Sequence, residues 1–262
     1  KIFEGLNSAH GSFKKNKSKL PGQKVEGTHF VLRDEVTTAM WDNHLKGIGQ
    51  SLGIMPVNED SKCKWGCIDV DKFELDYEEI LKKIRKLSLP LIMCRSKSGC
   101  AHIFLFTTKF IPAEEVRFVL LRFAAQLGLA DKLDRIYPMQ TNFVKGGTGS
   151  WLNLPYFNHE EGTRYAYKDN FDAADLNEFF ELHDQYALDS YSSLSRQQIK
   201  YTSLPYQLHS EDRNSMLHSI ESRLPYLDFE LADFMLSLPD NLKLEDGKTK
   251  LIQREAFKSK LP

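Results

Sequence analysis

Two aspartates one residue apart, Asp69 and Asp71, stand at the end of a short apolar stretch that begins at Cys67. Side chains at positions i and i+2 of an extended strand point to the same face of a sheet, so these two carboxylates can share divalent metal ions. The alternative is an acidic strand end that leads into a solvated turn. The acid pair therefore predicts a metal site only in combination with further residues.

A second polar group lies at 95–102, where Arg95, Lys97, Ser98 and His102 surround a glycine at the junction of two predicted strands. Arginine, lysine, small hydroxyls and a neutral imidazole can hold phosphate oxygens. Basic residues beside a glycine turn also suit a triphosphate. Together with the carboxylates, this group indicates polyphosphate chemistry. The alternative is a set of surface charges with a structural histidine at the start of an apolar strand.

Helices and strands must position these residues. Apolar and β-branched runs predict strands at 65–70, 89–94 and 101–107. Apolar residues at helical spacing predict helices at 36–47, 77–87, 112–128 and 172–183. The close succession of the second and third strands predicts an antiparallel pair. That pair argues against a simple parallel sheet and favours an α+β fold.

The order and spacing of these residues resemble the archaeo-eukaryotic primase superfamily. Asp69-Val70-Asp71 resembles its first, metal-binding motif, and Ser98-Gly99-Cys100-Ala101-His102 resembles its second. The sequence of these motifs most resembles that of primase-polymerases from phages, plasmids and mobile or defence elements. Those proteins carry a second glycine where this chain has Cys100. The segment 134–140 resembles the one that carries the third acid, which implies Asp134 as a ligand, with Asp131 as the alternative. The likeness covers residues 25–183.

The resemblance implies an α+β fold: a primase catalytic core with an RRM-like βαβ unit and a small N-terminal α/β module. It implies a template-dependent nucleotidyltransferase, a DNA primase or primase-polymerase, that joins nucleotides and releases pyrophosphate. The expected cofactor is Mg²⁺ or Mn²⁺. The expected partners are a DNA template, nucleoside triphosphates, and a helicase or another replication or defence protein.

The resemblance also assigns site residues. Asp69, Asp71 and Asp134 are the expected catalytic residues and metal ligands. The triphosphate is expected to contact four polar residues, Arg95, Lys97, Ser98 and His102. Asn153 and Trp151 are expected, from alternation along a strand, to face opposite sides, with Asn153 toward the sugar or base of the nucleotide and Trp151 in the core.

The character of the sequence changes near residue 185. We expect a catalytic domain at 1–185, a polar, serine-rich linker at 186–202 and a small helical segment at 203–262. The helical segment resembles the tail of the synthetase domain of asparagine synthases, but the pyrophosphate loop of that family is absent from the sequence. Because so short a segment barely sustains a core, we expect a structural or interaction role. Phe234 and Leu236 should then pack inside it or against the catalytic domain.

The chain has 262 residues and a net charge of −1, unlike a strongly basic nucleic-acid-binding protein. No apolar run approaches the ~20 residues of a membrane helix, so no membrane partner is expected. The four cysteines lack the paired spacing of a zinc site, and unpaired cysteines favour a reducing compartment and hence a cytoplasmic location. Because the chain begins at Lys1, we expect a piece of a longer protein, so missing targeting signals mean little.

Two other functions stay open. A catalytically inactive module could bind nucleotides or nucleic acid with the same fold while its helical tail docks a partner. A fragment of an asparagine synthase-like amide synthetase would need its pyrophosphate loop elsewhere in a longer chain. The acid pair, followed by Ser98 and His102, favours the enzyme.

Overall fold

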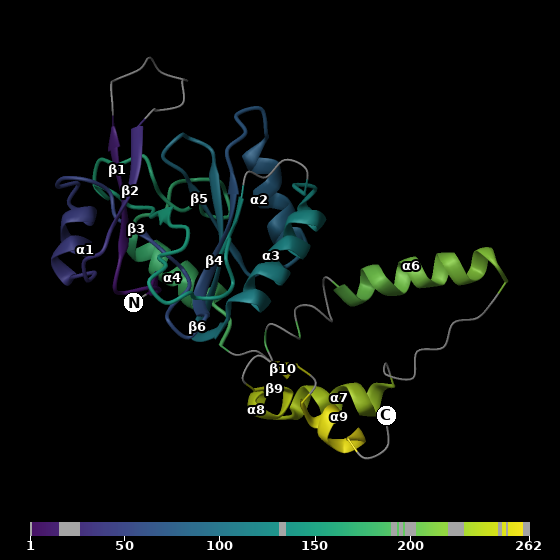
Figure 1. Ribbon diagram of the computed structural model, residues 1–262. Coiled ribbons are helices and arrows are strands. Elements are labelled where there is room, and N and C mark those ends of the chain that lie inside the picture. Colours follow the sequence, from purple (N-terminus) through teal and green to yellow (C-terminus); the bar gives the residue numbers. More distant parts are fainter. Residues whose placement is uncertain are drawn as a thin grey trace. The chain divides into compact units, whose positions relative to one another are not determined.

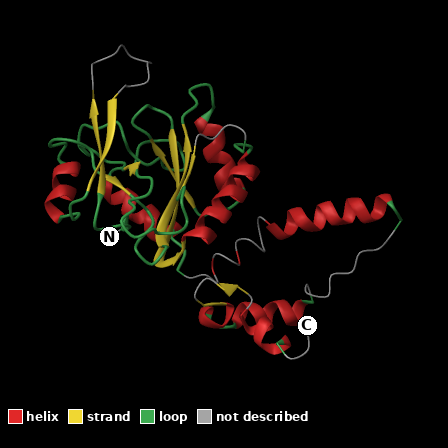
Figure 2. Cartoon of the chain, in the orientation of Figure 1, coloured by secondary structure: helices red, strands yellow, loops and turns green. Residues whose placement is uncertain are grey.

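The structure is a computed structural model that describes residues 2–15, 27–130, 135–189, 193, 196, 203–219, 228–245, 248–249 and 251–258. Its chain divides into two compact units, unit 1 at Lys1–Leu188 and unit 2 at Asp189–Pro262, and each is described by itself. Unit 1 combines strands with helices, whereas the described residues of unit 2 are mainly helical (Figure 2).

The central sheet of unit 1 has four strands in the order β5-β6-β4-β7. Its elements follow along the chain as β4 (Lys62–Val70), α2 (Tyr77–Lys86), β5 (Leu91–Arg95), β6 (Ala101–Pro112), α3 (Ala113–Leu127) and β7 (Arg135–Tyr137). Every neighbouring pair is antiparallel, so β4 and β5 run parallel on either side of β6. This βαββαβ order is the ferredoxin-like arrangement of RRM domains, which confirms the predicted α+β class and RRM-like unit.

Helices α2 and α3 cover one face of this sheet, and the strands of a second sheet lie on its other side (Figure 1). Side chains along β4 alternate between the two faces. Gly66 faces α3, because a Cβ atom there would lie only 2.5 Å from the Leu120 side chain. By alternation, Asp69 lies on the opposite face, turned away from the helices. The sheet therefore presents its acidic strand end toward the second sheet.

The face that is turned away from α2 and α3 carries an aromatic core. The ring centroid of Phe3, from the N-terminal segment, lies 5.5 Å from that of Trp65, 5.3 Å from that of Phe104 and 5.2 Å from that of Phe106, all edge-on. Such edge-to-face pairs add to the stability that comes from burial. Cys67 and Cys94 are completely buried in the same core, as predicted for small apolar residues.

The second sheet has the order β2-β1-β3-β8. It contains β1 (His10–Lys15), β2 (Gly27–Leu32), β3 (Gly53–Ile54) and β8 (Leu152–Asn153), with α1 (Thr38–Leu45) between β2 and β3. The predicted N-terminal module is therefore completed by a strand from much later in the chain. Because β8 follows β7 in sequence, the second sheet is tied directly to the edge of the central one.

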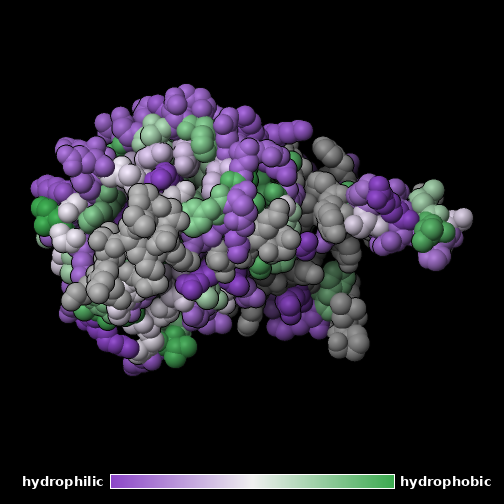
Figure 3. All heavy atoms as spheres, turned by 90° about the horizontal axis from the view of Figure 1, so that it is seen from above, coloured by the Kyte–Doolittle hydropathy of each residue, from purple (hydrophilic) through white to green (hydrophobic). Residues whose placement is uncertain are grey.

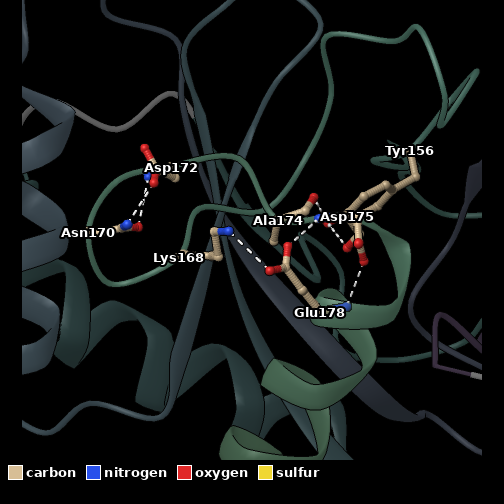
Figure 4. Close-up of polar contacts among 7 residues, drawn as sticks. All are labelled: Tyr156, Lys168, Asn170, Asp172, Ala174, Asp175 and Glu178. Carbon is tan, nitrogen blue, oxygen red and sulfur yellow. Dashed lines mark hydrogen bonds and ion pairs between the residues drawn. The ribbon is translucent and has the colours of Figure 1, made fainter.

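Helix α4 (Leu176–Tyr186) begins four residues later than the sequence predicts. Asp175 is its N-cap, and its side chain accepts a hydrogen bond from the Glu178 N–H while Glu178 accepts one from the Asp175 N–H. This reciprocal capping box satisfies two N–H groups at the helix start, so the helix begins there and not at 172. Lys168 Nζ lies 3.0 Å from Glu178 Oε1, and the Tyr156 hydroxyl donates to the Ala174 carbonyl (Figure 4). These contacts fasten α4 to the chain that follows β8.

Unit 2 contains four described helices, α6 (Ser203–Leu217), α7 (Phe229–Ser237), α8 (Asp240–Lys243) and α9 (Leu251–Phe257). It also contains a small hairpin that the sequence did not predict, β9 (Leu244–Glu245) with β10 (Lys248–Thr249). Phe234 on α7 is 55 % exposed, so it does not pack inside unit 2. Packing of this helix against the catalytic domain stays a prediction.

On the face drawn in Figure 3, hydrophilic residues predominate and hydrophobic ones are scattered between them. Single exposed apolar side chains of this kind are normal on protein surfaces. Among the helices in the described ranges, none is both long and apolar enough to cross a membrane.

Candidate functional site

The acidic end of β4 is flanked on both sides by basic residues. Asp69 is the direct cross-strand partner of His102 on β6 and of Arg135 on β7. Directly opposed residues of antiparallel strands project on the same face. The His102 Nε2 atom lies 3.4 Å from Asp69 Oδ1, and both side chains are mostly buried. The pairing of β4 with β6 therefore places the first and second predicted motifs side by side.

The second carboxylate, Asp71, follows β4 directly and is tied to the turn between β5 and β6. Ser98 Oγ donates to Asp71 Oδ1 at 2.7 Å, and it lies 2.9 Å from Ser96 Oγ. The turn is closed by the Ser96 N–H, which donates to the Cys100 carbonyl. A hydroxyl that orients a carboxylate in this way limits its rotation before any ligand binds.

The turn needs glycine at one position only. Gly99 has a φ of 95°, which side chains rarely adopt. Cys100 is buried and does not have a positive φ, so the residue that replaces the second glycine of the resembling motif fits without strain. Burial raises the pKa of the Cys100 thiol, which keeps it neutral beside Asp71.

A cavity of about 350 Å³ opens over this end of the central sheet. Twelve residues from both sheets line it: His29, Asp69, Asp71, Ser96, Lys97, Ser98, His102, Arg135, Tyr137, Trp151, Leu152 and Asn153. Its volume is within the range of small-ligand pockets. Six of the residues that the sequence singled out thus meet in one cavity: Asp69, Asp71, Lys97, Ser98, His102 and Asn153.

Lys97 is held at the cavity wall by an aromatic ring of the second sheet. Its Nζ atom lies 3.0 Å from the centroid of the Phe13 ring on β1. A cation above a ring face is attracted by the quadrupole of the ring. The lysine that was predicted to bind phosphate is therefore positioned by a strand that the sequence did not connect with the site.

Positive charges in the cavity wall affect the protonation of neighbouring side chains. The pKa of His29 is lowered, first by burial and then by the positive charges of Lys97 and Arg135, so this imidazole stays neutral. Burial raises the pKa of Tyr137, against the effect of its hydrogen bond with Arg135. Two cations close to a pair of carboxylates suit a ligand that brings both phosphate groups and metal ions.

Two of the predicted site residues lie elsewhere or outside the description. Arg95 does not line the cavity, since its Nη1 donates to the Thr163 carbonyl at 2.9 Å. Its role as a phosphate ligand stays a prediction. Asp134 and its alternative Asp131 fall outside the described residues.

The described part of the site offers two carboxylates as candidate metal ligands, Asp69 and Asp71. Within the described ranges, no group of three or more His, Cys, Asp and Glu side chains is arranged to hold a metal ion. Asp69 and Asp71 nevertheless face the same cavity, and carboxylate oxygens are the donors that Mg²⁺ and Mn²⁺ prefer. The donor set fits such ions, with a third acid expected just before β7.

Sequence reasoning missed six lining residues: His29, Ser96, Arg135, Tyr137, Trp151 and Leu152. Arg135 and Tyr137 belong to the segment that was searched for the third acid, and residues two apart on a strand share a face, so their spacing was a usable signal. Trp151 was expected in the core, on the side opposite to Asn153. It is partly buried against Leu6, Ala9 and Met55, and it also lines the cavity beside Asn153, because residues two apart on an extended chain share a face. His29 gave no signal, because β2 reaches the site only through the pairing of the second sheet.

The match to a family model agrees with these features. The family described as "TOTE conflict system, Archaeo-Eukaryotic Primase domain" matches residues 7–202. A solved structure of the AEP domain of the cyanophage S-2L primase-polymerase (PrimPol) is similar at 11 % identity and a TM-score of 0.37, covering 69 % of this chain and 91 % of that chain. No curated protein matches at a significant level. These matches give no support to the asparagine synthase likeness of 203–262, which stays a prediction.

Proposed function

The chain belongs to the family of archaeo-eukaryotic primase domains of TOTE conflict systems, and on that premise we propose that it is a template-dependent nucleotidyltransferase. It acts as a DNA primase or primase-polymerase, joining nucleotides with release of pyrophosphate. One observation carries the proposal: Asp69 and Asp71 share a cavity with Lys97, Ser98 and His102. Carboxylates for metal ions and cations for a triphosphate are the two requirements of phosphoryl transfer.

The residues of the cavity divide into two roles. Lys97, Ser98 and His102 bind the phosphates of the incoming nucleotide. Asp69 and Asp71, with Asp134, hold Mg²⁺ or Mn²⁺. When bound, these ions neutralise charge on the phosphates and lower the pKa of the attacking hydroxyl. Ser98 serves both groups, because its hydrogen bond to Asp71 fixes the carboxylate that faces the phosphate turn.

A DNA template is the proposed macromolecular partner, and a helicase or another replication or defence protein is a further one. A non-catalytic module that only binds nucleotides or nucleic acid is the second candidate. It would use the same cavity, and the near-neutral net charge of −1 favours a small ligand over a long stretch of nucleic acid. Nucleotide addition separates the two functions.

The test is templated extension by the whole chain with Mg²⁺ or Mn²⁺ and either ribo- or deoxyribonucleotides. The double variant Asp69→Asn/Asp71→Asn should lose nucleotide addition, because two charges that hold the metal ions are removed while side-chain size is kept. Asp60→Asn, an exposed acid outside the cavity, is the matched control. Extension by the double variant at the parental rate would overturn the proposal. Binding of nucleotide without any extension by the parent would favour the second candidate.

A further inference from the structure

Trp151 lies on a floor made by two glycines from neighbouring strands. Gly11 on β1 and Gly53 on β3 are direct cross-strand partners. A Cβ atom at Gly11 would lie 1.9 Å from Trp151 Cδ2, and one at Gly53 would lie 2.2 Å from Cε3. Any side chain at either position would therefore displace the indole. The second sheet therefore has no side chain at the two positions on which the Trp151 ring packs.

The indole also belongs to an aromatic wall of the cavity. The His29 ring centroid lies 5.3 Å from the Trp151 ring at a tilt of 45°, and it lies 4.8 Å from the Phe13 ring. Phe13 in turn holds Lys97. The cavity thus combines a polar part, with the carboxylates and the phosphate turn, and an aromatic part that is supplied by the second sheet.

We infer that Trp151 is the stacking platform for the base of the bound nucleotide, an inference that rests on the proposed function. The glycine floor explains how the indole is supported, but Trp151 is only partly buried and lines the same cavity as Lys97 and His102. Stacking on an aromatic ring is tolerant of base identity, because every base has a π face. A platform of this kind suits an enzyme whose nucleotide choice is left to the template.

Because the indole packs on backbone atoms, ligand binding costs less conformational entropy. A ring that is already fixed loses little freedom when a base stacks on it. Ser51 Oγ donates to Asn153 Oδ1 at 2.9 Å, which fixes the orientation of the neighbouring amide in the same way. The nucleoside side of the cavity is therefore organised before a ligand arrives.

Tryptophan fluorescence tests the inference directly. The chain has three tryptophans, and Trp65 is fully buried while Trp41 lines a separate apolar cavity. With Mg²⁺ present, ATP should quench the emission of the parent protein, whereas inorganic tripolyphosphate should not. Trp151→Phe should remove the quenching, and the matched control Trp41→Phe should keep it. Quenching that persists in Trp151→Phe would overturn the inference.

Calorimetric titration adds an affinity readout. Trp151→Leu should weaken ATP binding on the order of tenfold, the scale of losing one base–aromatic stack, and should leave tripolyphosphate binding unchanged. Gly11→Ala, which pushes the ring from its floor, should act in the same direction. Equal losses for both ligands would mean a structural role and overturn the inference. If Trp151→Leu does not fold, the fluorescence of Trp151→Phe still decides.

The two proposals fail in different ways. If the parent protein binds neither ATP nor tripolyphosphate, both the proposed function and the platform are wrong. If ATP binds but Trp151→Leu binds it as tightly as the parent, only the platform is wrong. A single-stranded oligonucleotide that quenches Trp151 while ATP does not would assign the ring to the template and overturn the inference as well.

Discussion

Asp69 and His102 face each other across strands β4 and β6, with His102 Nε2 3.4 Å from Asp69 Oδ1. The contact joins the proposed metal site to the proposed phosphate site. It also means that neither residue can be changed without altering the surroundings of the other, so variants must be compared on more than one ligand.

His102→Ala should weaken nucleotide binding about tenfold to a hundredfold, the range for losing a hydrogen bond to a charged group. Binding of a labelled DNA template, followed by fluorescence anisotropy, should change little, because His102 is placed inside the cavity. His159→Ala, an exposed histidine outside the cavity, is the control. Equal losses for nucleotide and template would point to a general folding defect and not to a phosphate contact.

Ser98→Ala should raise the Mg²⁺ or Mn²⁺ concentration needed for half-maximal activity about tenfold or more, the usual effect of losing a group that orients a metal ligand. The variant removes the 2.7 Å hydrogen bond to Asp71. The control is Ser8→Ala, whose hydroxyl donates to the exposed Glu59 carboxylate. Metal titration of nucleotide addition measures the effect. An unchanged metal dependence would mean that Asp71 is oriented by other groups.

Phe13→Leu should weaken nucleotide binding severalfold, since the cation–π contact that positions Lys97 contributes about 0.5–1 kcal/mol or more. A matched control exists in Phe110→Leu, because Lys64 lies 4.8 Å above the Phe110 ring away from the cavity. In a Lys97→Ala background, Phe13→Leu should have no further effect on nucleotide binding. An additional loss in that background would show that Phe13 acts on the site by another route.

The stability of unit 1 should depend on His44. Burial lowers the pKa of His44 to about 4, the Pro155 hydrogen bond opposes this shift, and the positive charge of Arg164 adds to it. The Nδ1 atom accepts the Leu52 N–H and Nε2 lies 2.7 Å from the Pro155 carbonyl oxygen, so the neutral ring is the form that fits. Protonation would place a second hydrogen against the Leu52 N–H.

The sign of the effect follows from proton binding. Between the ordinary pKa near 6.5 and the lowered value of about 4, the unfolded chain binds the proton and the folded chain does not. The free energy of unfolding should therefore be highest above pH 6.5 and fall as the pH drops toward 4. His44 should contribute about 3 kcal/mol to this fall. Denaturant unfolding of the parent and of His44→Gln should show a difference that shrinks over this window, with His159→Gln as control. A constant difference would contradict the assignment.

Removal of residues after 189 should leave ATP and metal binding of the remaining chain close to those of the parent. All the cavity residues belong to unit 1. The cut should retain Leu188, whose N–H donates to the Phe106 carbonyl and whose carbonyl accepts from Thr108. Thermal unfolding and gel filtration report any loss of stability or change in oligomeric state. Loss of metal binding by a folded truncated chain would place part of unit 2 in the site.

Local patterns in the sequence were sufficient to predict several strands and helices of unit 1 and part of the candidate site. The apolar runs around Asp69 and His102 predict strands, and helical spacing with a terminal glycine predicts α3, which ends at Leu127 before the left-handed Gly128. The acid pair and the 95–102 turn were recognisable because their chemistry lies within short segments. Strand register then brought Asp69 and His102 together, as their order along the chain had suggested.

Tertiary structure alone decided the other wall of the site. His29 and Trp151 reach the cavity, and Phe13 reaches Lys97, through the pairing of β1, β2, β3 and β8, of which β8 lies more than a hundred residues after β1 and β2. Pairing between distant strands is set by packing across the whole unit, and single-sequence periodicity carries no record of it. The glycine pair under Trp151 has a meaning only after Gly11 and Gly53 are seen side by side, since a close approach between backbone and ring is a property of the assembled sheet.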